Sequence, residues 1–151
     1  YVSYVVTAEG IYPQKDCGFD YRTSVFKTRK ELIVSACFNL ENVEFDESQE
    51  KIDKFLKLRA KKNPGGRSCG CVFKNDGYFA GKIIEQAGLK GLAVGGARVS
   101  EKHANFIVAD KNATSGDIAG LINRIKKEVK ERIGADLSEE LEYIGTYNDR
   151  Q

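Results

Sequence analysis

The chain has 151 residues, a formal net charge of +2 and 41% hydrophobic residues, enough for one ordinary domain or one and a half small ones with a buried core. No apolar run approaches the roughly 18 residues of a membrane-spanning helix, and no basic, apolar leader opens the chain. We therefore expect a cytoplasmic protein with no membrane partner, and the near-balanced charge by itself predicts no polyanion partner.

Residues 2–8 and 32–40 are rich in β-branched and apolar side chains, and we expect both to be strands of one sheet. The chain begins within the first of these strands, so we expect Tyr1 to be a fragment boundary and most of that sheet to be missing. The acidic stretch 41–47 is predicted to be a linker into a second unit. The sequence thus predicts two units, 1–43 and 44–151.

The second unit is expected to open with a helix over 48–60. Asp46 and Gln49 resemble a capping box, Ile52, Phe55, Leu56 and Arg59 share one helical face, and the glycines and proline of 63–66 end the helix. The further predicted elements are a strand at 71–74, a helix at 79–87 closed by Gly88, a strand at 104–109, a helix from Thr114 to Gly134 and a strand at 137–144.

The helix that ends at Gly134 has the clearest sequence signals. Thr114 and Asp117 have capping spacing, and six aliphatic residues recur at intervals typical of one helical face. These six are Ile118, Leu121, Ile122, Ile125, Val129 and Ile133. Because helices and strands do not strictly alternate, we predict an α+β fold whose core lies between this helix and a small sheet.

The chain contains four cysteines and one histidine, too few and too irregularly spaced for a disulfide framework or a structural metal site. Cys17 and Cys37 are expected to be small buried hydrophobic residues in a reducing cytoplasm. Cys71, two positions after Cys69, precedes Lys74 and Asn75 in a string that combines a thiol with anion-binding groups. A cysteine-dependent hydrolase that uses Cys71 and His103 is one alternative for this string.

A second alternative is a domain that binds RNA or another polyanion through a cluster of basic residues. This cluster consists of Lys57, Arg59, Lys61, Lys62 and Arg67. The cluster contains no aromatic side chains of the kind on which single-stranded binders stack bases. The glycines of 65–70 match neither nucleotide-binding fingerprint, so the residues alone support only contact with an anion.

Several strings in order make the chain resemble the UDP-N-acetylenolpyruvoylglucosamine reductases, flavoenzymes that complete UDP-N-acetylmuramate for the bacterial cell wall. The strings are Tyr21-Arg22-x-Ser24-x-Phe26-Lys27, Arg59-x-x-Lys62-x-Pro64, Gly70-Cys71-x-Phe73-Lys74-Asn75, residues 95–108 and residues 137–145. The short spacing from Lys27 to Lys62 resembles the compact family type without a substrate-covering loop. The resemblance implies an oxidoreductase that uses FAD and NADPH.

The resemblance also implies residue roles. Arg22 would support the substrate carboxylate and the developing enolate, Cys71 would donate a proton where the family usually has serine, and Glu140 would be the second catalytic acid. Substrate-binding roles fall on Tyr21, Lys62, Asn75 and His103, and FAD contacts fall on Arg22, Gly70 and Cys71. The implied substrate is the enolpyruvyl ether of UDP-N-acetylglucosamine, with no nucleic acid or metal partner.

The family's N-terminal FAD-binding motifs do not occur in this sequence. The resemblance therefore implies that 1–43 are the last strands of an FAD-binding domain and that 44–151 are the substrate-binding domain. We expect this chain alone to hold no FAD and to be inactive, and to associate with the FAD-domain segment that it lacks.

Overall fold

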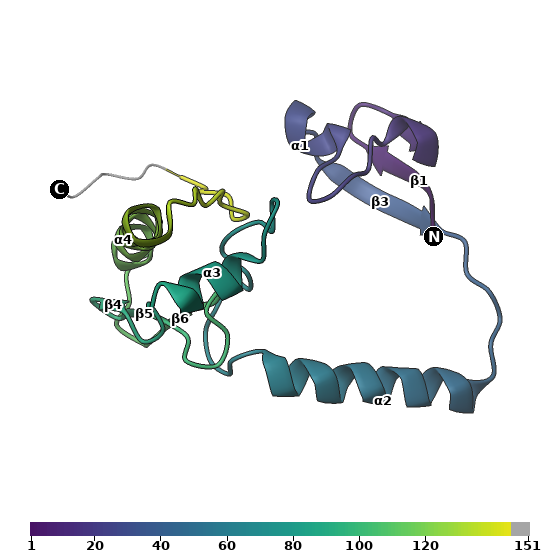
Figure 1. The fold of residues 1–151 in the computed structure, drawn as a ribbon. Helices are drawn as coiled ribbons and strands as arrows, with labels where there is room; N and C mark the ends of the chain where they lie inside the picture. Colours follow the sequence, from purple (N-terminus) through teal and green to yellow (C-terminus); the bar gives the residue numbers. More distant parts are fainter. Residues whose placement is uncertain (146–151) are drawn as a thin grey trace. The chain divides into compact units, whose positions relative to one another are not determined.

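A computed structural model describes residues 1–145, which are traced in chain order in Figure 1. The described residues fall into two compact units, Tyr1–Ile52 and the residues from Asp53 onward. The division lies inside helix α2 (Phe45–Lys62), and each unit is described here by itself. The assignment of the parts to flavin and substrate domains remains a prediction.

The first unit is built on an antiparallel sheet in which β1 (Val2–Thr7) lies between β2 (Ile11–Pro13) and β3 (Ile33–Phe38). Both predicted strands are confirmed. The short strand β2 was not predicted, because three residues ending in proline carry almost no strand pattern. A tight turn joins it to β1: the amide of Thr7 donates to the carbonyl of Gly10 at 2.8 Å.

The core of the first unit is small. Val5, Cys17 and Phe26 are its buried members, and the ring of Tyr12 meets that of Phe26 edge to face at 5.3 Å. A 3-10 turn (Gln14–Asp16) and helix α1 (Val25–Arg29) bring Cys17 and Phe26 onto the sheet. The predicted burial of Cys17 is confirmed, whereas Cys37 is only half-buried because β3 lies at the sheet edge.

Strand β3 and helix α2 expose much of their apolar surface. Val34 on β3 is 65% exposed, and Ile52, Phe55 and Leu56 on α2 are each at least half exposed. The predicted helix is present but longer than 48–60. Because α2 begins at Phe45, Asp46 lies in its first turn and the predicted cap there is wrong.

The second unit has the predicted α+β fold. Its elements are α3 (Ala80–Gln86), β4 (Ala93–Val94), β5 (Ala97–Val99), β6 (Ile107–Ala109) and α4 (Ser115–Ile133). The three strands form an antiparallel sheet in the order β4-β5-β6, and α4 contacts β4 and β5. Leu121, Ile122, Ile125 and Val129 of α4 are buried in this core, which confirms the predicted inward face of the helix for these four residues. Ile118 is partly buried, and the predicted burial of Ile133 is wrong, because this last residue of the helix is 40% exposed.

Helix α4 has the ends that the sequence predicts. Thr114 and Asp117 form a reciprocal capping box, and Gly134 ends the helix at a φ of 78°. Asp117 also accepts a hydrogen bond from the amide of Gly96, in the turn between β4 and β5. Backbone hydrogen bonds from Thr114 and Gly96 lower the pKa of Asp117. One carboxylate therefore joins the helix to the hairpin.

Two predicted strands of the second unit are wrong. The segments 71–74 and 137–144 meet only through the isolated bridge between Phe73 and Glu139. The ladder stops there because the chain turns away after Lys74, with Gly77 at a φ of 73°. The predicted strand 104–109 exists only from Ile107 onward, because residues before it belong to a tight turn.

Within residues 1–145, no helix is long and apolar enough to cross a membrane.

The hairpin of β4 and β5 was not predicted, although the sequence contains a signal for it. Val94 pairs with Ala97 across a two-residue turn, and Gly95 has a φ of 52°. A Gly-Gly pair between short apolar runs is a recognised hairpin signal. A Cβ at Gly96 would lie 2.7 Å from backbone atoms of Ala113, so any other residue there would force the backbone to shift.

We expect Ile122→Asp to unfold the second unit. Ile122 is 0% exposed, and burying an unpaired charge belongs to the class of substitutions that cost about 4 kcal/mol or more. Thermal unfolding followed by circular dichroism measures the effect. Asn123→Asp, at the exposed neighbouring position on α4, is the matched control and should change little. Equal melting of Ile122→Asp and the parent chain would contradict the packing of α4.

Candidate active site

A buried asparagine fixes the segment that contains Cys71. Asn105 is 2% exposed, and its side-chain amide bonds both ways to one residue: the amide of Phe73 donates to Oδ1 at 2.9 Å and Nδ2 donates to the Phe73 carbonyl at 2.8 Å. The backbone of Asn105 also accepts from the amide of Val72 at 2.9 Å. Residues 72–73 are therefore held by three hydrogen bonds to a single residue.

Cys71 follows a bulge in this segment. Arg67 bridges to Ala109 and Cys71 bridges to Phe106, so the stretch 67–71 contains one residue more than the stretch 106–109 that faces it. Gly70, directly before Cys71, has a φ of 91°. Such bulges reorient a side chain at functional sites, and glycine supplies the conformation. Cys71 is half-buried at the end of this bulge.

The other side of the segment is paired with the residues around Glu140. The amide of Glu140 donates to the carbonyl of Val72 at 2.8 Å, and the amide of Lys74 donates to the carbonyl of Ser138 at 2.8 Å. Cys71 is the neighbour of Val72 along the chain. The fold therefore brings together the segments of two of the three predicted catalytic residues, Cys71 and Glu140, although they are far apart in sequence.

Glu139, the neighbour of Glu140, is anchored to helix α4. Its carboxylate accepts from Lys126 Nζ at 2.9 Å and from the Tyr143 hydroxyl at 2.8 Å. Burial opposes ionisation of this carboxyl, but the hydrogen bonds from Lys126 and Tyr143 outweigh it, and the pKa of Glu139 is lowered. The anchor fixes the backbone from which Glu140 projects.

The Asn75 side chain caps the start of helix α3. Its Oδ1 accepts a hydrogen bond from the amide of Ala80 at 3.0 Å, so it satisfies one of the amides that the first turn leaves without a helical acceptor. The residue is exposed. A capping contribution of Asn75 was not predicted from the sequence.

His103 lies in the turn that precedes β6. Its Nδ1 accepts from the amide of Asn105 at 3.2 Å, and its ring packs on Phe106 at a centroid distance of 4.9 Å. With Nδ1 as acceptor, the ring proton of neutral His103 is on Nε2. A Cβ at Gly81 would lie 3.2 Å from this ring, so helix α3 also confines it.

Lys62 is the last residue of α2 and is exposed. The preceding turn is held by Lys102, whose Nζ donates to the carbonyl of Ala60 at 2.6 Å. Lys102 is the neighbour of His103, so the end of α2 and the turn with His103 are joined. The predicted substrate-binding residues Lys62 and His103 thus belong to connected parts of the second unit.

Tyr21 and Arg22 belong to the first unit. Arg22 has a φ of 55°, a conformation that few non-glycine residues adopt, within a turn closed by the bridge between Asp20 and Thr23. Its guanidinium lies 5.4 Å from the centroid of the Tyr21 ring. Both side chains are exposed, so the turn presents a cation and an aromatic ring together.

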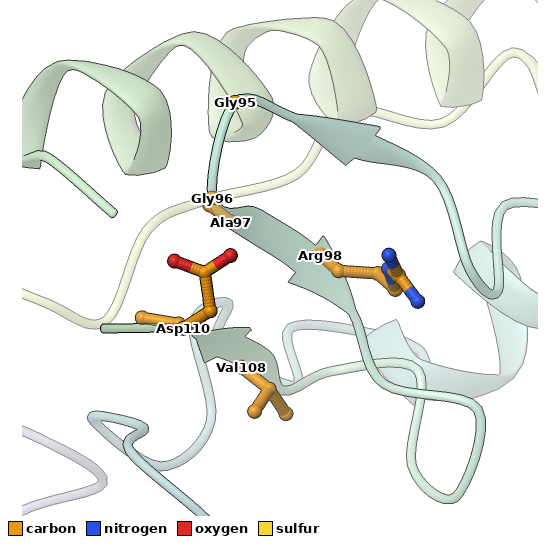
Figure 2. A pocket seen from close by; sticks show the side chains of 7 residues that line it. Gly95, Gly96, Ala97, Arg98, Val108 and Asp110 are labelled. Atoms are coloured by element: carbon orange, nitrogen blue, oxygen red, sulfur yellow. The ribbon is translucent and has the colours of Figure 1, made fainter. Parts of the chain in front are cut away.

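A pocket of about 280 Å³ lies over β5 and β6, as Figure 2 shows. The Asp110 carboxylate points toward Gly96, and Arg98 extends away from it. The amide of Asn112 donates to the Asp110 carboxylate at 2.7 Å, an arrangement typical of a turn. None of the predicted site residues lines this pocket.

In residues 1–145, no three histidine, cysteine or acidic side chains are grouped to hold a metal ion.

Two residues that support the site, Asn105 and Glu139, were not predicted from the sequence. Asn105 is a polar residue between the apolar Ala104 and Phe106, a pattern that indicates a buried amide with dedicated partners. Nothing comparable distinguishes Glu139 from Glu140, because the difference depends on Lys126 of a separate helix.

Known proteins are similar to this chain over most of its length, including the segments of Cys71 and Glu140. A family model described as "UDP-N-acetylenolpyruvoylglucosamine reductase, C-terminal domain" matches residues 61–144. Two proteins called UDP-N-acetylenolpyruvoylglucosamine reductase are similar along most of the chain. The protein of Clostridium beijerinckii is 42% identical over 89% of this chain and 45% of its own length. The protein of Staphylococcus haemolyticus is 38% identical over 90% of this chain and 45% of its own length.

A solved structure shares the fold. The crystal structure of the UDP-N-acetylenolpyruvylglucosamine reductase of Thermus caldophilus matches with a TM-score of 0.78 and 32% identity, over 93% of this chain and 51% of the solved chain. This chain therefore spans about half the length of the proteins that it matches.

We expect Asn105→Ala to destabilise the second unit and to loosen the Cys71 segment. The substitution leaves the buried amide and carbonyl of Phe73 without their partner, and one such loss costs about 1–3 kcal/mol. Urea unfolding measures the stability, and hydrogen exchange at the Phe73 amide measures the loosening. Asn112→Ala, at an exposed position, is the control. An unchanged hydrogen-exchange rate at the Phe73 amide would show that the Asn105 side chain does not hold this segment.

We expect the stabilising effect of Glu139 to disappear in acid. Its folded-state pKa lies below the ordinary value of a glutamate, about 4.3, so the carboxylate contributes stability above that pH and loses it as the pH falls through the lower folded value. The difference in urea midpoint between the parent and Glu139→Gln should therefore be large at pH 7 and shrink toward pH 3. Glu131→Gln, whose carboxylate is exposed and 3.9 Å from Lys127, should show little difference at either pH.

Proposed function

This chain belongs to the UDP-N-acetylenolpyruvoylglucosamine reductase family, and we propose that it is the substrate-binding part of an enzyme that reduces UDP-N-acetylglucosamine enolpyruvate to UDP-N-acetylmuramate. The observation that carries the proposal is the pairing of the Cys71 segment with both Asn105 and Glu140 inside the matched residues. NADPH is the proposed reductant. The product would enter peptidoglycan synthesis in the cytoplasm.

FAD is the proposed cofactor, and the residues beside Cys71 fit one face of a flat ring system. Gly70 has a φ of 91°, and the position that a Cβ would occupy there has no atom within 4 Å. A ring can therefore approach the backbone at Gly70. Bound FAD would supply hydride to the enolpyruvyl group. The residues of this chain assigned to it are Arg22, Gly70 and Cys71, and the activity is to be tested in a protein of the relatives' full length that carries this chain.

Cys71 is the proposed proton donor. The carbon next to the substrate carboxylate must gain a proton, and Sγ–H of Cys71 provides one from a half-buried position that the bulge fixes. A thiol is a stronger acid than the serine hydroxyl usual in the family. The three hydrogen bonds of Asn105 to residues 72–73 keep this donor in one place, as general acid catalysis requires.

Two further groups of the chain have the chemistry to stabilise the negative charge that develops on the carboxylate. The guanidinium of Arg22 can pair with both carboxylate oxygens, and Glu140, when protonated, can donate to one of them. Glu140 projects from a backbone that Val72 and the anchored Glu139 hold. Lys62, Asn75, His103 and Tyr21 are the proposed substrate-binding residues, with Lys62 suited to the diphosphate of the nucleotide.

We expect Cys71→Ala, in the full-length protein, to leave reduction of the enzyme by NADPH intact. Its oxidation by the enolpyruvyl substrate should slow by about 100- to 10,000-fold, the usual contribution of a general acid. Cys71→Ser should keep much of the activity, because the hydroxyl retains a proton on the same bulge. Stopped-flow measurement of each half-reaction separates the two effects.

Lys62→Ala is the contrasting variant. A binding residue contributes alike before and during the reaction, so its loss should raise KM and leave kcat largely intact. Equal slowing of both half-reactions in Cys71→Ala, or an inactive but folded Cys71→Ser, would show that the proton comes from another group, with Glu140 the next candidate.

A further inference from the structure

Two thiols, Cys69 and Cys71, belong to one bulge. Cys69 is exposed and Cys71 is half-buried, with only Gly70 between them. We propose that Cys69 and Cys71 form a redox-sensitive pair that closes to a disulfide when a hydroperoxide is present. The sequence motif assigns a function to Cys71 but none to Cys69.

The backbone allows the two thiols to meet. Residues two apart in a regular strand have Cα atoms about 6.7 Å apart, and disulfides join Cα atoms roughly 4.4–6.8 Å apart. The positive φ of Gly70 departs from a regular strand, and glycine changes between such backbone conformations more readily than any other residue. No atom lies within 4 Å of the Cβ position at Gly70, so the stretch has room to adjust.

The chemistry needs one oxidant and no metal. Cys69, the more exposed thiol, attacks the terminal oxygen of the hydroperoxide, which gives a sulfenic acid at Cys69 and releases the alcohol, or water when the oxidant is hydrogen peroxide. The sulfur of Cys71 then attacks the Cys69 sulfur and displaces water, with the Cys71 proton leaving in that water. The two thiols lose two electrons in total, and the peroxide gains them.

A disulfide across a single residue is confined to a small ring, and it lies at the surface. Disulfides that are strained and exposed are the easily reduced ones, and they are typical of regulation. The bond should therefore open again with a dithiol. This reversibility distinguishes the pair from Cys17, whose thiol is fully buried in the core of the first unit.

The consequence for activity rests on the proposed function. Closing the disulfide removes the Sγ–H of Cys71, the proposed proton donor. The three hydrogen bonds between Asn105 and residues 72–73 do not involve this thiol and can remain. The enzyme would then stop when hydroperoxide accumulates and resume after reduction. A serine at the position of Cys71 would provide the proton without this response.

The disulfide can be tested on this chain without an activity assay. The folded chain is treated with hydrogen peroxide, its remaining thiols are alkylated, and it is cleaved with trypsin. Cleavage after Arg67 and Lys74 releases residues 68–74, which contain both cysteines and no others. We expect this peptide to lack alkyl groups and to be lighter by two hydrogen atoms, and dithiothreitol before alkylation to restore two alkylated cysteines. A peptide that stays doubly alkylated, or that gains only oxygen atoms, would overturn the proposal.

Two variants assign the bond. Cys69→Ser should lose the cross-linked peptide and accumulate oxygen on Cys71 that dithiothreitol does not fully remove, whereas Cys37→Ser should form the cross-link as the parent does. A peptide 68–74 that is still lighter by two hydrogen atoms in Cys69→Ser would overturn the pair.

Activity in the full-length protein separates this inference from the proposed function. We expect peroxide to cause a loss of turnover that dithiothreitol reverses in the parent, and only an incompletely reversible loss in Cys69→Ser, whose turnover before oxidation matches the parent. A cross-link that leaves turnover unchanged would contradict Cys71 as proton donor but not the disulfide. Dependence of turnover on Cys71 without any cross-link would contradict the disulfide alone.

Discussion

The two-way hydrogen bonding between the Asn105 side chain and the Phe73 backbone is the contact on which the candidate site depends. A buried backbone amide and carbonyl need hydrogen-bond partners, and a neighbouring strand of the sheet would normally provide them. Here the Cys71 segment has only isolated bridges to its neighbours, and the Asn105 side chain takes the place of a missing ladder. A side chain can form these hydrogen bonds without extending the sheet. The bulge at Gly70 is therefore retained.

This substitution of a side chain for a ladder also explains which elements could be predicted. Helix α4 depends on local signals, namely the box of Thr114 and Asp117, the aliphatic face and Gly134, and all of them are present in the structure. The segments 71–74 and 137–144 have strand-like composition, but strand formation depends on a partner of sufficient length. The segment 71–74 ends early, because the chain turns away before Gly77. The composition of one segment does not show how long its partner strand will be.

The candidate site divides in the same way. The motifs selected Cys71 and Glu140, and the fold brings their segments together through Val72. Asn105 and Glu139 were missed because their roles come from pairs remote in sequence: Asn105 acts on Phe73, and Glu139 is held by Lys126 of α4. Arg22 shows a third case, since its positive φ follows from the turn around it rather than from its residue type.

A thiol at the end of the bulge changes the chemistry of the site in two ways that have one origin. Sulfur holds its proton less tightly than a hydroxyl oxygen does, which favours proton donation from Cys71, and the same property makes sulfur open to oxidation. A serine there would avoid the second effect. Because Cys69 stands on the same bulge, oxidation has a reversible product within reach, a disulfide in place of the over-oxidised sulfur that a solitary thiol would form.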